Sequence, residues 1–275
     1  MKVPSPYTVA APFLYMTPMR PAAEFQSPSP EEFRSTILPA GEPAVLRGVA
    51  DRWPLVAASK QGSGWLEILA AHASDKTVGI IRAEPDEEGR FHYTPDGKSL
   101  NFIRGRADLR TFLGVLDRTA SAPRPHALAV QALPADQFIP GFASAHPMPF
   151  VPDDSQPLAW IGNASKVATH NDPFDNIAVV AAGRRRFTVF PPCAEPDLYL
   201  GPDQPTPAGT PVSMVHVTKP DLDRYPRFAA ALAVAHEAEL GPGDAMFIPM
   251  DWYHHVEALE PLNMLINYWW KSDRG

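Results

Sequence analysis

The sequence has little cysteine, no excess of positive charge and no long apolar run. A single cysteine, Cys193, excludes an intrachain disulfide and is typical of a reducing compartment, so we expect a cytoplasmic protein. The chain has 24 lysines and arginines against 31 aspartates and glutamates, and its formal net charge is −7. With Arg184-Arg185-Arg186 as its one dense basic run, it is not expected to bind nucleic acid. No stretch approaches the roughly 18 apolar residues of a membrane-spanning helix, and prolines interrupt the apolar N-terminus, so we expect neither a membrane span nor a signal peptide.

Proline, by contrast, is abundant. The 33 prolines and 17 glycines among 275 residues argue against a helical bundle and favour short strands joined by many turns. From about residue 126, short apolar runs alternate with glycine, proline and aspartate. These runs predict strands at 127–133, 158–161, 177–182, 186–190, 212–217, 245–248, 254–259 and 264–270. Eight short strands separated by turns favour a β-sandwich or β-barrel.

The first half of the chain has a different pattern. Its runs predict strands at 42–47 and 77–83, helices at 65–72 and 108–116, and an exposed loop at 86–97. Later in the chain, the alanine-rich run at 226–236 predicts a helix. No linker is clear enough to divide the chain. We therefore expect one domain over residues 1–275, with a β core at about 125–271 and a helical N-terminal elaboration at 1–124, whose first forty residues wrap over the surface.

The segment 167–172 carries the first chemical signal, His170-Asn171-Asp172. On an extended strand, residues i and i+2 face the same side, so His170 and Asp172 aim an imidazole and a carboxylate at one point. They form two thirds of a 2-His-1-carboxylate triad, which holds Fe(II) and leaves positions open for substrate and oxygen. This short pattern is weak alone, but His254-His255 follows a turn and a strand further on. Adjacent histidines on a strand face opposite sides, so only one of them can join the site.

Further motifs follow in a fixed order. They are H-N-D at 170–172, Asn176, G-R-R-R at 183–186, F-P-P at 190–192, K-P-D-L-D-R-Y-P-R-F at 219–228, G-P-G-D at 241–244, I-P-M at 248–250 and N-Y-W at 267–269. Over roughly residues 125–271 this series resembles the Jumonji-C-like cupins, and more narrowly the group containing the asparaginyl hydroxylase of hypoxia-inducible factor. The resemblance implies a mainly β fold, the eight-stranded jelly roll called a double-stranded β-helix, which binds Fe(II) and 2-oxoglutarate and oxidises a substrate with O₂.

The resemblance also implies roles for single residues. The metal ligands are His170, Asp172 and His254, the cofactor-binding residues are Arg185, Asn176 and Asn267, and Trp269 lies on the substrate side of the iron. Relatives commonly use a lysine where this chain has Arg185, and the arginine fork suits a carboxylate well. Strand alternation turns Arg184 and Arg186 to the opposite side. Val167 stands where the family has a threonine, and a family tyrosine has no match other than Gln131.

Three hypotheses follow. The first is an Fe(II)/2-oxoglutarate-dependent oxygenase, preferably a hydroxylase of a protein or peptide side chain, although a small-molecule substrate is left open. The second is a metal-binding cupin that does not use 2-oxoglutarate. The third is a non-catalytic jelly-roll binding module, against which the open coordination of the triad argues. The oligomeric state is also left open.

Overall fold

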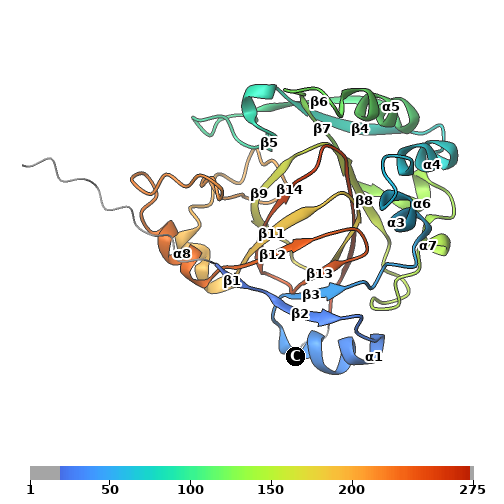
Figure 1. The fold of residues 1–275 in the computed structure, drawn as a ribbon. Helices are drawn as coiled ribbons and strands as arrows, with labels where there is room; N and C mark the ends of the chain where they lie inside the picture. The colour runs from blue at the N-terminus through green and yellow to red at the C-terminus, as the bar shows by residue number, and fades with distance from the viewer. Residues whose placement is uncertain (1–18, 273–275) are drawn as a thin grey trace, which may run out of the picture.

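The computed structural model describes residues 19–272 and is built around two facing β-sheets (Figure 1). Eight consecutive strands supply four antiparallel strands to each sheet, in the orders β12-β11-β14-β9 and β13-β10-β15-β8. These core strands are β8 (Leu158–Gly162), β9 (Lys166–Asn171), β10 (Asp175–Ala182), β11 (Arg185–Phe190), β12 (His236–Leu240), β13 (Ala245–Ile248), β14 (Tyr253–Ala258) and β15 (Asn263–Trp270). The arrangement confirms the predicted jelly roll.

Strand alternation separates the space between the sheets from an outer core. In β10, Ala178 and Val180 pack between the sheets together with Phe187 of β11. Ile177 and Val179 of the same strand pack on the other side, under the helices. Every residue of β10 is buried because both faces of this strand are covered.

The chain before β8 extends both sheets. Strands β1 and β5 lie at the two edges of the six-stranded sheet, while β2 and β3 extend one edge of the nine-stranded sheet and β7, β4 and β6 the other. Their bounds are β1 (Arg20–Pro21), β2 (Ala23–Gln26), β3 (Ala44–Arg47), β4 (Thr77–Ala83), β5 (Arg90–Phe91), β6 (Phe102–Asp108) and β7 (Ala127–Pro134). The N-terminal elaboration therefore contributes strands as well as helices.

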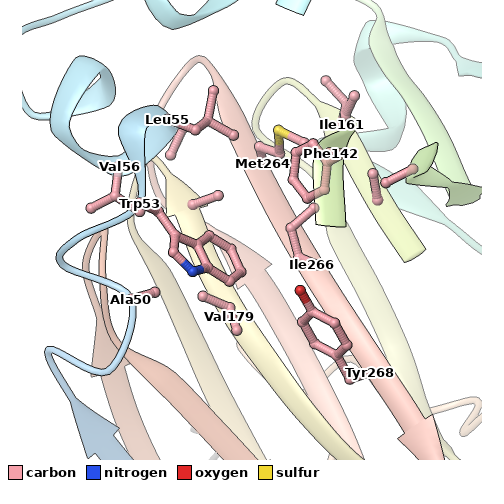
Figure 2. Close-up of a cluster of buried hydrophobic side chains, with 14 of the residues drawn as sticks. Ala50, Trp53, Leu55, Val56, Phe142, Ile161, Val179, Met264, Ile266 and Tyr268 are labelled. Atoms are coloured by element: carbon pink, nitrogen blue, oxygen red, sulfur yellow. The ribbon is translucent and has the colours of Figure 1, made fainter. Parts of the chain in front are cut away.

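Short helices cover the outer face of the nine-stranded sheet. Figure 2 shows Trp53, Leu55 and Phe142 beside Val179 and Ile266 of the sheet, in the outer core. The helices of this layer are α3 (Pro54–Ser59), α4 (Trp65–His72), α5 (Leu109–Thr119), α6 (Ala135–Phe138) and α7 (Phe142–Ala145). Elsewhere lie α1 (Pro30–Glu32), the π-helix η1 (Phe33–Ile37), α2 (Leu38–Ala40), the 3₁₀ turns η2 (Pro85–Glu87) and η3 (Pro192–Asp197), and α8 (Phe228–Val234). No helix in the described residues has the length and apolar character needed to span a membrane.

Several predicted elements are confirmed, one is wrong and two are confirmed only in part. The predicted helix at 65–72 matches α4, and the Asp108 carboxylate caps α5 by accepting the Thr111 N–H. The predicted strand at 212–217 is wrong, because this segment makes only single contacts, such as the Ser213 N–H to the Thr169 carbonyl, and lies along no full ladder.

Two predictions hold only in part. The predicted helix at 226–236 ends at Val234, since residues 236–240 form β12 against β11. The predicted exposed loop at 86–97 contains β5, whose Phe91 is buried and pairs with β9. Of the N-terminal forty residues predicted to wrap over the surface, 1–18 lie outside the described residues, and Phe33 and Ile37 are buried.

Candidate metal centre

His170, Asp172 and His254 meet on the inner face of the six-stranded sheet. Antiparallel pairing of β9 with β14 sets His170 opposite His254, and Asp172 follows β9 directly. One ligand atom from each of the three lies within 4.8 Å of the others, and His254 Nε2 is 3.7 Å from Asp172 Oδ2. Two imidazoles and one carboxylate in this arrangement suit a divalent iron with open positions. The structure therefore brings the three predicted residues together, and their role as ligands stays a prediction.

A β-bulge in β9 sets the direction of the His170 side chain. Val167 pairs with Val256 and His170 pairs with His254, so β9 carries one extra residue between these pairs. On a regular strand, residues 167 and 170 would face opposite sides. The bulge lets both side chains line the cavity between the sheets. An apolar Val167 therefore lines this cavity where the resembled family has a threonine.

Backbone carbonyls orient both imidazoles. Nδ1 of His170 is 2.8 Å from the Ala168 carbonyl oxygen, and Nδ1 of His254 is 3.3 Å from that of Trp252. With the proton on Nδ1, each ring donates to its carbonyl and keeps the Nε2 lone pair for a metal. Burial, followed by the neighbouring His170, lowers the pKa of His254, so this ring is neutral at pH 7. His254 therefore has the protonation state that a metal ligand needs.

His255 faces away from the triad. It lines a separate small cavity with His216 and Lys166, and burial lowers its pKa to about 3. Only one histidine of the adjacent pair lines the cavity of the triad, as strand alternation predicts.

Arg185 of β11 lines the same cavity as the triad and is 4% exposed. Within residues 19–272 it forms no ion pair, and its Nε is buried without a hydrogen-bond partner. Burial lowers its pKa to about 10, which leaves it charged at pH 7. Arg186, on the opposite face, instead pairs with Glu239 and Glu257. Because a buried charge without a partner is costly, the cavity is suited to an anionic ligand.

The nine-stranded sheet contributes amides and an indole to the cavity. Asn267 Nδ2 donates to Asn176 Oδ1 at 2.9 Å, which leaves Asn176 Nδ2 and Asn267 Oδ1 buried without partners. Trp269 lines the same cavity and stacks on Phe174, with ring centroids 6.2 Å apart and planes 14° apart. All seven predicted site residues therefore line one cavity, while their individual functions stay predictions.

Trp160 is a cavity residue that the sequence prediction missed. It lies on β8, lines the cavity of Arg185 and the triad, and has a buried Nε1–H without a partner. Gln131, the nearest match to the family tyrosine, lines an adjacent cavity and not this one. Alternation along β8 was the available signal, because Ala159 and Ile161 pack into the outer core and turn Trp160 inward.

We expect Trp160→Phe to weaken 2-oxoglutarate binding roughly tenfold, the effect of losing one hydrogen bond to a charged group. The ring volume is largely kept while the donor is removed. Calorimetric titration of the metal-loaded protein measures the affinity, and the iron content of the same variant serves as the control. An unchanged affinity would show that the indole N–H does not contact the co-substrate.

Comparison with known proteins places this chain in a family. A family model described as a cupin-like domain matches residues 30–274. The chain is 36% identical over 115 residues to lysine-specific demethylase JMJ31 of Arabidopsis thaliana, which covers 42% of this chain and 20% of that protein. It is 28% identical over 259 residues to lysine-specific demethylase 8 of Danio rerio, and this match covers 93% of this chain and 59% of that protein. It is 35% identical over 103 residues to tRNA wybutosine-synthesizing protein 5 of Mus musculus, and this match covers 38% of this chain and 30% of that protein.

The chain belongs to the cupin-like domain family, and its relatives place it with the Jumonji-C-like cupins. It spans less than two thirds of the length of each of these relatives. This group uses iron(II) and 2-oxoglutarate, and the residues of the cavity fit both. The triad offers the donor set of a ferrous site, and the unpartnered Arg185 offers the charge for a carboxylate.

Proposed function

We propose that this protein is an Fe(II)- and 2-oxoglutarate-dependent oxygenase that hydroxylates a side chain of a polypeptide. The observation that carries the proposal is the unpaired guanidinium of Arg185 in the same cavity as the His-Asp-His triad. A metal-binding cupin without an organic acid ligand has no need of a buried cation there. The membership of the family supports the same conclusion.

Iron(II) and 2-oxoglutarate, when bound, supply the activation of O₂ and the oxidation of a substrate C–H bond. His170, Asp172 and His254 would hold the ion, and a set of three protein ligands would leave coordination positions for the co-substrate and oxygen. Arg185 would bind the far carboxylate of 2-oxoglutarate, and the amide atoms of Asn176 and Asn267 that lack partners would supply further polar contacts. The apolar side chains of Phe187 and Leu265 line the cavity, where they limit the access of water.

Removal of a methyl group from a lysine side chain is the second candidate activity. It is favoured by the names of two relatives, which are lysine-specific demethylases. The two activities differ in their products, because demethylation releases formaldehyde whereas a stable hydroxylation adds one oxygen atom to the peptide.

The proposal predicts a weak visible charge-transfer band when the Fe(II)-loaded protein is mixed with 2-oxoglutarate without oxygen. Turnover of 2-oxoglutarate to succinate across a panel of peptides and metabolites, with mass spectrometry and a formaldehyde assay, then separates the candidates. Bound iron without the band would indicate a cupin that does not use 2-oxoglutarate. Failure to bind any metal would indicate a non-catalytic jelly-roll module.

A further inference from the structure

A slot lies between β4 and β7 in the nine-stranded sheet. β4 pairs with β6 along its whole length, from Thr77 to Ala83, but with β7 only at Ile81–Ala83. On the side of β7, residues 77–80 therefore pair with no strand, although alternate residues of an antiparallel strand turn their N–H and C=O groups to that side. A cavity of about 250 Å³ occupies this place, lined by residues 77–81 and 130–134. We call it the β4–β7 slot.

A second β-bulge lies where β7 leaves β4. Val130 pairs with Ile161 of β8 and Leu133 with Ala159, so β7 carries one extra residue between them. Within the bulge Ala132 has a φ of 49°, a left-handed conformation that is costly for a residue with a Cβ. The bulge keeps β7 on β8 while its other edge stays open to the slot. Bulges of this kind are common beside functional sites.

The slot leads to the metal centre through a further cavity of about 270 Å³. This connecting cavity shares Arg104, Gln131 and Ala132 with the slot. It shares Trp160 and His170 with the cavity of the triad. A chain that lies in the slot can therefore continue toward the metal ligands.

The slot carries positive charge in an acidic protein. Arg104 and Arg106 lie two residues apart on β6 and face the same side, opposite Ile81 and Gly79 of β4. Both are exposed, and neither forms an ion pair with an acidic side chain within residues 19–272. Arg104 lines both the slot and the connecting cavity, with its guanidinium 5.3 Å from the centre of the Phe102 ring. Free cations at this place complement an acidic ligand.

We propose that an extended acidic peptide segment binds in the β4–β7 slot as an added strand and leads the target residue to the metal centre. This names the substrate class of the proposed function and rests on it. Added strands bind through main-chain hydrogen bonds and gain specificity from side-chain contacts. The open edge of four residues, about 13 Å at strand spacing, suits a peptide segment of similar length. Arg104 and Arg106 select acidic side chains on one face of that segment.

Fluorescence anisotropy with three labelled octapeptide pools tests the proposal. The first pool has Asp or Glu fixed at alternate positions, the second has Lys at the same positions, and the third is the acidic pool with N-methylated backbone amides. We expect the acidic pool to bind best and to lose about tenfold in affinity on N-methylation, because methylation removes the main-chain donors. Equal binding of the acidic and basic pools, or an N-methylated pool that binds as well as its parent, would overturn the proposal.

Two pairs of variants locate the binding. Arg104→Ala should weaken binding of the acidic pool roughly fivefold, the scale of an exposed ion pair, whereas Arg82→Ala, on the opposite face of β4, should leave it unchanged. A Cβ at Gly79 meets nothing within 4 Å, so Gly79→Tyr adds a ring on the face of Arg104 and should abolish binding, while Gly79→Ala should not. Binding that survives Gly79→Tyr would place the peptide elsewhere, on residues 1–18 or at a contact between two copies of the chain.

The outcomes separate this proposal from the proposed function. Formation of the iron and 2-oxoglutarate band by the unsubstituted protein reports the oxygenase site alone. A band without binding of the acidic pool would overturn the peptide proposal and leave the oxygenase standing. Selective peptide binding that is blocked at Gly79, without the band, would support the docking site and overturn its assignment to an oxygenase.

Discussion

Replacement of Arg185 by methionine is expected to weaken binding of 2-oxoglutarate by about a hundredfold or more while iron binding is retained. The guanidinium is buried at 4% exposure, so it would bind a carboxylate with little competition from water. Loss of one partner of a buried charge pair costs roughly 3–5 kcal/mol, which corresponds to this change in affinity. Calorimetric titration of the metal-loaded protein without oxygen measures the effect.

The same variant also tests the stability of the protein, which is expected to rise although the affinity for 2-oxoglutarate falls. Without ligand, Arg185 is a buried cation without an acidic partner in residues 19–272, so its removal should raise the free energy of unfolding, by roughly 1–4 kcal/mol. Arg186→Met is the matched control, because Arg186 faces the other side and pairs with Glu239. A ligand-free Arg185→Met protein that is less stable, with unchanged affinity for 2-oxoglutarate, would make Arg185 a structural residue.

Replacement of His170 by alanine is expected to abolish stoichiometric iron. The variant leaves one imidazole and one carboxylate, and loss of even an outer partner of a metal ligand costs about 10–100-fold in affinity. We expect the loss of a direct ligand to exceed about 100-fold. Iron per chain after desalting, together with the rise in melting temperature on adding Fe(II) without oxygen, measures the effect.

His255→Ala is the control for this experiment. His255 is next to His254 in the sequence and equally buried, but it lines a different cavity. We expect its iron content to match that of the unsubstituted protein. Full iron occupancy in His170→Ala, or loss of iron only in His255→Ala, would contradict the ligand assignment.

The convergence of His170 and Asp172 on one cavity follows from local geometry. Their spacing on an extended strand places both side chains on one face, and the same alternation separates Arg185 from Arg186 and His254 from His255. Each of these inferences needs only the alternation of side chains along a single strand, so it can be made from the sequence.

Long-range pairing sets the features that the sequence did not predict. The bulges in β9 and β7 depend on the register of neighbouring strands, as does the slot that opens where β4 and β7 part. The predicted helix at 226–236 included His236, the first residue of β12, and 237–240 were not predicted as a strand, because His236–Leu240 becomes a strand by pairing with β11. The run at 212–217 has strand-like residues, but only a single bridge, between Ser213 and Leu200, forms there. The cytoplasmic location and the division into one domain with a core at 125–271 stay predictions.

The position of β15 has a consequence for how the protein matures. β15 lies between β10 and β8 in the sheet, although it is the last of the core strands to leave the ribosome. It also carries Leu265, Asn267 and Trp269, which line the cavity. A nascent chain can therefore contain His170, Asp172 and His254 before β15 exists, and until then β10 and β8 each have one edge without its partner strand. The complete lining of the cavity is thus present only in a polypeptide whose synthesis has passed residue 270.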